Sequence, residues 1–177
     1  TGGTDTAPPS NNPTFIMIAQ EMVAYPDELY NVGGNIVTYK YQREFPELKT
    51  INYMNAIRLE KLKQETGAFD VLYYSEHGVT ECPRNNFFAF IGDTLITPSE
   101  HILHGVTRKI VLQLAREHFD VEERPISFGE LPMLDEAFVT STTKGVLPIV
   151  EIDGHQLGRG HVGCLLYTSD AADEHTG

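Results

Sequence analysis

Four short polar segments of the sequence carry side chains that could do chemistry. Lys49 stands in PELKTINY, and Glu81 stands in VTECPRNNFF between two apolar runs. The segments 105–108 (GVTR) and 141–143 (STT) lie before and after apolar runs. Taken singly, each segment also has a plain structural explanation, because surface lysines, loop carboxylates, helix caps and polar turns are common.

Taken together, the four segments supply the groups that a single cofactor requires. A lysine amine can form an imine with an aldehyde and then move a proton, and a carboxylate can keep a ring nitrogen protonated so that the ring accepts electrons. The free N–H groups at the start of a helix suit a phosphate, and so does a turn rich in hydroxyls. These are the groups that pyridoxal 5′-phosphate (PLP) needs.

Composition excludes several other classes of protein. The chain has 177 residues, is 41% hydrophobic and carries a net charge of −12. This size allows one real core, and the acidic balance argues against nucleic acid and anionic membrane surfaces as partners. The longest apolar run, residues 15–19, is far too short to cross a membrane. Histidines and cysteines show no metal-ligand spacing, so we expect no metal site.

The chain opens with TGGTD, which has neither the basic nor the apolar stretch of a signal peptide. The two cysteines, Cys82 and Cys164, lie far apart and predict no disulfide framework. We therefore expect a cytoplasmic protein.

Apolar periodicity predicts strands interspersed with two main helices. The expected strands cover residues 14–22, 36–43, 70–75, 86–91, 94–97, 122–126, 137–141, 146–152 and 155–157. Several neighbours are separated only by turn formers, which is typical of hairpins. No glycine-rich dinucleotide or triphosphate loop is present. The pattern favours an α+β fold with a mixed or antiparallel-rich sheet.

The first helix is expected over residues 52–66 and the second over residues 107–119. In the first, the apolar side is predicted to comprise Met54, Ile57, Leu59 and Leu62, with Gly67 as the stop. In the second, it is predicted to comprise Ile110, Val111, Leu114 and Ala115. Ser127 and Glu130 match a capping box that opens a further short helix.

Residues 34–163 resemble the large domain of class IV aminotransferases, the PLP fold type IV group that includes branched-chain and D-amino-acid aminotransferases. The similar stretches are LKTINYMNAIRLEKLKQETGAFDVLYY, GVTECPRNNFFAF, ILHGVTRKIVLQLARE and DEAFVTSTTKGVLPIVEIDGHQLGRG. The lysine and the glutamate of these motifs lie 32 residues apart, as suits the family. Four motifs in the right order make this resemblance specific.

The resemblance implies a role for each of eight residues. Lys49 is the catalytic residue, at the Schiff-base position, and Glu81 provides the carboxylate for the ring nitrogen. The cofactor-binding residues implied in all are Lys49, Tyr53, Glu81, Leu103, Val106, Thr107 and Thr142.

Within this set, Val106, Thr107 and Thr142 would bind phosphate, and Leu103 would lie near the face of the ring. Tyr53 would lie near the 3′-oxygen, as in branched-chain members. Thr143 would border the substrate carboxylate, and no metal is implied.

The resemblance also implies a domain organisation. Residues 1–24 correspond to the end of an N-terminal small domain and its last strand, 25–34 to an interdomain linker, and 35–163 to the PLP-binding large domain of mixed sheet or pseudo-barrel with flanking helices. Residues 164–177 (CLLYTSDAADEHTG) resemble translated sequencing adapter, so we expect a non-native tail; a disordered native tail is the alternative. Most of the small domain, with its phosphate-binding arginine, and the last helix are expected to be missing. The intact protein is expected to be a homodimer.

The implied activity is transamination between an amino acid, branched-chain L- or D-, and a 2-oxo acid such as 2-oxoglutarate. Two alternatives stay open: a PLP lyase similar to 4-amino-4-deoxychorismate lyase, and a catalytically inert fragment of the fold. The sequence departs from the family pattern at Arg84 and Lys144. Arg84 is interpreted as a surface residue or as a group that reaches a substrate carboxylate, of which we favour the first, and Lys144 is assigned no role.

Overall fold

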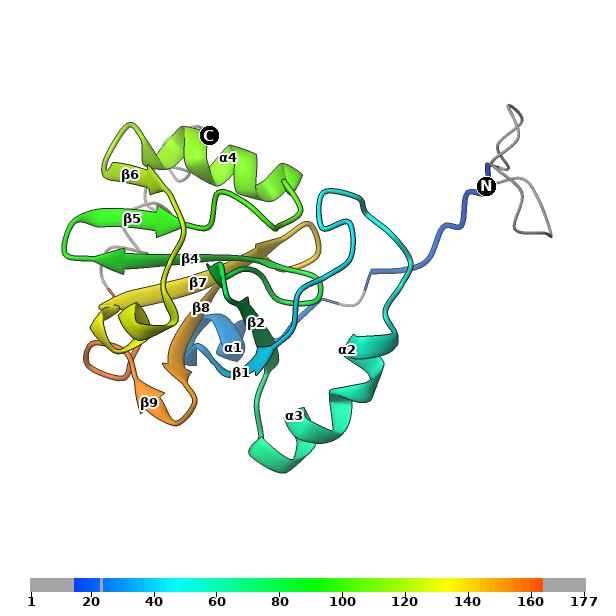
Figure 1. Cartoon of the computed structure of the whole chain (residues 1–177), viewed down its shortest axis with the longest axis horizontal. Helices are drawn as coiled ribbons and strands as arrows, with labels where there is room; N and C mark the ends of the chain where they lie inside the picture. Colours follow the sequence, from blue (N-terminus) through cyan, green and yellow to red (C-terminus); the bar gives the residue numbers. More distant parts are fainter. Residues whose placement is uncertain (1–14, 23, 164–177) are drawn as a thin grey trace.

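A single mixed sheet of nine strands organises the computed structural model, which describes residues 15–22 and 24–163 (Figure 1). Its order is β3-β2-β1-β8-β7-β4-β5-β6, and β9 pairs with β8. The strands are β1 (Gly34–Lys40), β2 (Asp70–Ser75), β3 (Gly78–Val79), β4 (Asn86–Ile91), β5 (Thr94–Thr97), β6 (Asp120–Glu123), β7 (Glu136–Ser141), β8 (Gly145–Ile152) and β9 (His155–Gln156).

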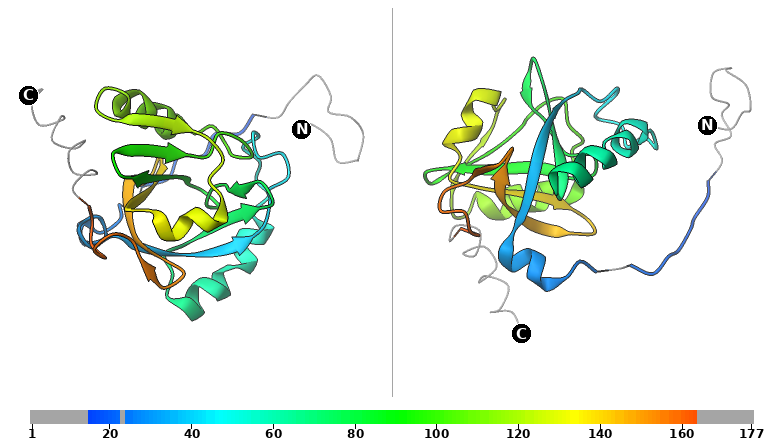
Figure 2. Two further views of the ribbon diagram at one scale, coloured as in Figure 1. Left: turned by 60° about the vertical axis from the view of Figure 1, so that its left-hand side comes forward. Right: turned by 90° about the horizontal axis from the view of Figure 1, so that it is seen from below.

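Parallel and antiparallel pairs are both present in this sheet. β1 runs parallel to β2 and to β8, and β5 runs parallel to β6. The remaining pairs are antiparallel. The sheet curls (Figure 2), and the Val79 N–H of β3 donates to Ile126 O, just after β6, over 2.8 Å, so that the two ends of the sheet come together. The expected mixed, antiparallel-rich sheet is therefore confirmed.

Apolar side chains cover both faces of the sheet. Along β4, Phe87 and Ala89 enter the main core cluster, whereas Phe88 and Phe90 enter a second cluster beneath a helix. This alternation is the period of two that a strand imposes. Phe88 stacks on Phe138 of β7 with ring centroids 4.9 Å apart, which ties the centre of the sheet together.

Among the described residues, five short helices accompany the sheet. They are α1 (Asp27–Val32), α2 (Met54–Arg58), α3 (Glu60–Thr66), α4 (Val106–Ala115) and a 3₁₀ helix, η1 (Phe128–Met133). The capping box of η1 is confirmed, because the Ser127 backbone N–H donates to Glu130 Oε2 over 2.7 Å. Gly67 ends α3 in the left-handed conformation, as its position predicts. None of the helices in the described part of the chain is long and apolar enough to cross a bilayer.

Two predictions near the N-terminus are wrong or incomplete. Described residues 15–22 form no strand, and the side chain of Phe15 is 83% exposed. An apolar run becomes a strand only where another strand completes its hydrogen bonds, and this segment leads away from the sheet (Figure 1). Residues 25–34, expected to be a linker, contain α1, whose Leu29 and Tyr30 pack on the main core. The predicted domain limits stay a prediction, and the predicted tail at 164–177 lies outside the described residues.

The predicted helix over residues 52–66 is divided at Leu59 into α2 and α3. Leu59 is 5% exposed and packs with Val71 on β2, but Met54 and Ile57 are 76% and 67% exposed. The predicted apolar side is therefore wrong for these last two residues. The pair of helices contacts the sheet mainly through Leu59 and Leu62, which leaves Met54 and Ile57 in solvent while Asn55 and Ala56 are partly buried.

The predicted face of the second helix is wrong in part. On α4 the buried positions are Arg108, Leu112 and Ala115, which follow the i, i+4, i+7 spacing of one helix face. Ile110 and Leu114 are half exposed instead. The prediction left Arg108 off the apolar face because arginine is charged, whereas in the fold its guanidinium is buried.

Candidate active site

One open cavity of about 380 Å³ is lined by all eight residues that the motifs predict. They are Lys49, Tyr53, Glu81, Leu103, Val106, Thr107, Thr142 and Thr143. Four connections supply them: the loop from β1 to α2, the loop from β3 to β4, the loop from β5 into α4, and the turn from β7 to β8. The structure thus brings together residues from four distant segments, whereas their individual roles stay predictions.

The loop between β1 and α2 places Lys49 at the mouth of the cavity. Short backbone hydrogen bonds shape it, such as those from Leu48 N–H to Phe45 O and from Thr50 N–H to Leu48 O, both 2.9 Å. Arg43 Nη2 also donates to Leu48 O over 3.3 Å. Lys49 itself is exposed and lies near enough to Glu81 for their charges to interact.

The carboxylate of Glu81 is buried, with the residue only 3% exposed. Its Oε1 accepts from Arg43 Nη1 at 2.6 Å, and its Oε2 accepts from Leu103 N–H at 3.0 Å and from Asn86 Nδ2 at 3.2 Å. Burial raises the pKa of Glu81 above its ordinary value, while the Leu103 N–H, the Arg43 guanidinium and the charge of Lys49 oppose that rise. Both oxygens are therefore held in a fixed direction beside the cavity.

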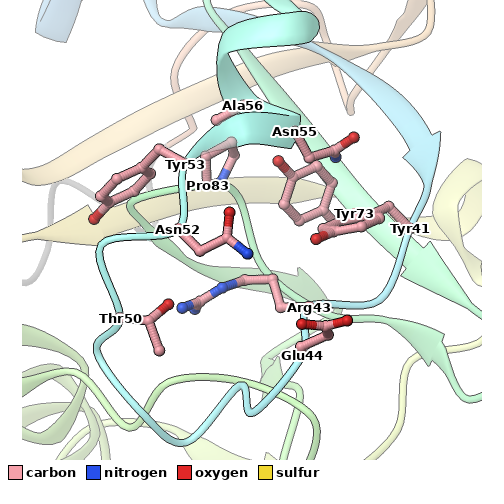
Figure 3. Close-up of a pocket in the computed structure, with 10 residues that line it drawn as sticks. All are labelled: Tyr41, Arg43, Glu44, Thr50, Asn52, Tyr53, Asn55, Ala56, Tyr73 and Pro83. Carbon is pink, nitrogen blue, oxygen red and sulfur yellow. The ribbon is translucent and has the colours of Figure 1, made fainter. Parts of the chain in front are cut away.

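Arg43 is the main residue of this site that sequence reasoning missed. Figure 3 shows its side chain in a small pocket beside the main cavity, close to Thr50 and Asn52, which belong to the same loop. The available signal was a basic residue six positions before Lys49. That signal is weak, because its acidic partner lies 38 residues further along the chain.

A buried polar chain connects two walls of the cavity. Lys144 Nζ donates to Asn85 Oδ1 at 3.1 Å, and Asn85 Nδ2 donates to Asp70 Oδ2 at 2.5 Å. All three residues are buried, and burial raises the pKa of Asp70 against the lowering effects of the Val71 N–H and the Lys144 ammonium. Lys144, which the sequence analysis left without a role, thereby links the turn after β7 to the loop that carries Glu81.

The start of α4 faces the cavity with its backbone N–H groups available. Its N-cap residue, Gly105, provides no side-chain hydrogen bond to the first turn. A Cβ atom at Gly105 would collide with Asn86 Oδ1. Asn86 is in turn fixed by its donation to Leu103 O over 2.6 Å. The close approach of this helix start to β4 therefore requires glycine.

Thr140 gives a direct test of whether the cavity suits a phosphorylated cofactor. Thr140 lines the cavity and is 1% exposed, and its buried Oγ1 has no hydrogen-bond partner within the described residues. A buried hydroxyl without a partner is costly and is expected to bind a ligand. Together with the uncapped start of α4 and the hydroxyls of Thr107 and Thr142, it fits a phosphate, while Glu81 fits a protonated ring nitrogen. The residues present are suited to PLP.

Comparison with known proteins decides the family. Residues 1–152 match the family described as Amino-transferase class IV. This chain is a class IV aminotransferase family member. The family predicted from the four motifs is confirmed.

Relatives and solved structures of this family resemble the chain. A protein of Aquifex aeolicus described as a probable branched-chain-amino-acid aminotransferase is 39% identical over 117 residues, which cover 63% of this chain and 37% of that protein. D-alanine aminotransferase of Bacillus licheniformis is 34% identical over 122 residues, covering 67% and 43%.

A solved branched-chain amino acid aminotransferase from T.th., with pyridoxamine 5′-phosphate, superposes with a TM-score of 0.77 at 27% identity, covering 87% of this chain and 54% of that one. A Legionella pneumophila protein provisionally described as a 4-amino-4-deoxychorismate lyase has a TM-score of 0.74 at 21% identity, covering 89% and 58%, and so shares the fold.

These likenesses confirm the expected fold of the class IV aminotransferases. The chain spans less than half the length of the two curated relatives and little more than half the length of the two solved structures. The class IV family member described here therefore carries the part of the fold that holds the predicted lysine and glutamate.

Proposed function

We propose that the chain is the lysine-bearing part of a PLP-dependent aminotransferase that moves an amino group between an amino acid and a 2-oxo acid such as 2-oxoglutarate. The observation that carries this proposal is the convergence of Lys49, Glu81 and the start of α4 on one cavity. When bound, PLP supplies an electron-accepting ring that labilises the substrate α-proton.

The residues around the cavity divide the work of binding and proton transfer. The Lys49 amine would hold the cofactor covalently and, once freed by the substrate amine, would carry the proton that transamination moves from the substrate α-carbon to C4′ of the cofactor. Glu81 would accept a hydrogen bond from the protonated ring nitrogen, and Arg43 opposes the rise in the pKa of Glu81 that burial causes.

The remaining residues hold the two ends of the ligand. We assign phosphate binding to Val106, Thr107 and Thr142, and we add Thr140, whose hydroxyl has no hydrogen-bond partner among the described residues. Leu103 would contact the face of the ring, and Tyr53 would lie near the 3′-oxygen, as both residues line the same cavity. Thr143 borders the substrate α-carboxylate.

The relatives named above support a branched-chain L-amino acid or a D-amino acid as the amino donor. Tyr53 favours the branched-chain side, following the family pattern from which its role was inferred. A homodimer and a cytoplasmic location belong to the same proposal.

The decisive experiment asks whether Lys49 binds the cofactor. The chain is incubated with PLP, reduced with borohydride and analysed by peptide mass. We expect the label on the peptide that contains Lys49, and its loss in Lys49→Ala. Lys61→Ala is the control, because Lys61 lies on the exposed side of α3 and pairs with Glu65. Equal labelling of wild type and Lys49→Ala would contradict the proposal.

Activity separates the remaining alternatives. We expect glutamate to form from 2-oxoglutarate with L-leucine or D-alanine as donor, and this rate to fall about 10³-fold or more in Lys49→Ala. Release of pyruvate from 4-amino-4-deoxychorismate would instead identify a lyase. Labelling at Lys49 without either reaction would identify a catalytically inert fragment that keeps the cofactor site.

A further inference from the structure

Arg84 lies at the boundary between the cofactor cavity and a second cavity. It lines the cavity of about 380 Å³ and also a neighbouring cavity of about 270 Å³. Tyr53 and Pro83 line both cavities as well. Arg84 is therefore placed to contact a ligand in either cavity.

The backbone that carries Arg84 is closely constrained. Glu81 and Asn86 form an antiparallel bridge, and Cys82 N–H donates to Asn85 O at 2.9 Å, so that Pro83 and Arg84 form the tip of a tight loop. The ring of Pro83 fixes its own φ angle and restricts the residue before it. The loop that directs Glu81 into the cofactor cavity thus also fixes the backbone position of Arg84.

The side chain of Arg84 is positioned by a contact that uses none of its N–H donors. The guanidinium carbon lies 4.8 Å from the centroid of the Tyr53 ring, in a cation–π contact. Tyr53 follows Lys49 by four residues in the same loop. Arg84 forms no hydrogen bond or ion pair within residues 15–22 and 24–163, so its five N–H donors are available to a ligand.

The acidic side chains nearby already have partners. Glu81 is paired with Arg43, Glu60 accepts from Lys63 at 3.1 Å, and Asp70 accepts from Asn85. At the second cavity Lys144 adds a further positive charge, since its ammonium donates to Asn85 and lies 5.1 Å from the Tyr25 ring centroid. The boundary between the cavities therefore has an excess of positive charge, which favours an anionic ligand group.

We propose that Arg84 binds the distal carboxylate of a dicarboxylic amino acid or 2-oxo acid whose reacting end lies in the cofactor cavity. A planar guanidinium with adjacent N–H groups matches a carboxylate with two parallel hydrogen bonds. The α-carboxylate is already assigned to Thr143, so a second carboxylate needs a second donor group, and the second cavity gives its chain room. This inference rests on the proposed function and adds to it the residue that binds the distal carboxylate of a dicarboxylic substrate.

The test compares a dicarboxylate with a monocarboxylate. Binding of glutarate and of pentanoate to the chain saturated with PLP is measured by titration calorimetry for wild type, Arg84→Gln and Arg84→Lys. We expect Arg84→Gln to bind glutarate about 10- to 100-fold more weakly and pentanoate unchanged, with Arg84→Lys in between, because a charged hydrogen-bonded pair is lost. Arg159→Gln is the matched control, since Arg159 is exposed, lines neither cavity and has no hydrogen bond or ion pair in the described structure.

Three results would overturn the inference. If Arg84→Gln weakens both ligands equally, the guanidinium does not distinguish the distal group; if it weakens neither, or if wild type does not bind glutarate, Arg84 is a surface residue. Circular dichroism checks that each variant is folded. The labelling of Lys49 is read separately: a chain that binds glutarate through Arg84 but is not labelled at Lys49 contradicts the proposed function alone.

Discussion

The pairing of Arg43 with Glu81 opposes the effect of burial on the pKa of the Glu81 carboxyl group. Burial favours the protonated acid, whereas a ring nitrogen that must stay protonated needs a carboxylate. Two N–H donors besides Arg43 help to hold Glu81 in the ionised form, namely Leu103 N–H and Asn86 Nδ2. Arg43 adds the opposite charge at 2.6 Å with little exposure of either side chain, so its contribution is only weakly screened by solvent.

Replacing Arg43 should therefore change the pH dependence of cofactor binding. The pKa of Glu81 is already raised by burial, and loss of the guanidinium raises it further. Since the ring nitrogen binds the ionised acid, affinity for PLP falls as pH drops through this pKa, and in Arg43→Gln the fall should begin at a higher pH. We expect affinity at neutral pH to weaken about 10-fold. PLP titrations across a pH series measure both effects.

Two variants make that measurement specific. Glu81→Gln should abolish the fall in PLP affinity at low pH, because no carboxyl group remains to titrate. Arg116→Gln, an exposed change at the far end of α4, should leave the pH at which PLP affinity falls the same as in wild type. If PLP affinity falls at the same pH in Arg43→Gln as in wild type, Arg43 does not control the ionisation of Glu81.

Among single residues, sequence reasoning found those that belong to motifs and missed those that contact the motif residues from elsewhere in the chain. Lys49 and Glu81 stand in recognisable segments, and the structure places both on one cavity. Arg43, by contrast, is a lone basic residue in a loop, which is typical of solvent-exposed positions. The unpartnered hydroxyl of Thr140 lies in a strand of ordinary composition, and only packing reveals that it lacks a partner among the described residues.

Among the elements, strands were predicted more accurately than helix faces. The bounds of β2, β4 and β5 are those expected, because each apolar run ends at turn-forming residues. Helix faces depend instead on what lies opposite. Arg108 is buried on α4 because Glu123 on β6 and the Pro98 carbonyl receive its N–H groups, at 2.9 and 2.8 Å. No local sequence pattern predicts the pairing of Arg108 with Glu123.

The start of α4 offers a test at the scale of one element. In Gly105→Ala the new methyl group collides with Asn86 Oδ1, so Asn86 must move and lose its bonds to Leu103 O and Glu81. We expect affinity for PLP to fall about 10-fold and the free energy of unfolding to drop by about 1–3 kcal/mol. PLP titration and urea unfolding measure the two effects.

Gly129→Ala is the matched control for this substitution. Gly129 lies in η1, and a Cβ atom there would meet only Ser127 Oγ, at 4.0 Å. We expect it to retain the affinity and the stability of wild type. If Gly105→Ala bound PLP as tightly as Gly129→Ala, the approach of α4 to β4 would not be what shapes the phosphate side of the cavity.

In the molecule as a whole, the curled sheet gathers four loops that are distant in sequence around one cavity (Figure 2). Long-range pairing produces this gathering: β1 lies between β2 and β8, and β4 lies between β5 and β7. Periodicity predicted the strands but not this order, because pairing depends on which faces bury each other. The resemblance to a known family supplied what periodicity lacked.

The same arrangement leaves an apolar surface exposed. Ile51, which precedes α2, and Met54 and Ile57, which lie on it, are 94%, 76% and 67% exposed. Isolated exposed apolar side chains are ordinary, but three large ones within two helical turns are typical of a surface that another surface covers. Because water is released when such side chains meet, we expect the chain to self-associate through this surface as its concentration rises.

Replacing these three residues together tests that expectation. The variant Ile51→Ser/Met54→Gln/Ile57→Gln removes apolar side chains that make little contact with the core, so it should keep the fold and shift sedimentation velocity profiles toward the monomer. The control Lys61→Gln/Glu65→Gln changes exposed polar positions on α3 and should sediment like wild type. If the triple variant associates as strongly as wild type, α2 is not the contact surface. If it becomes monomeric and still takes up PLP at Lys49, association and cofactor binding are separate properties of this part of the fold.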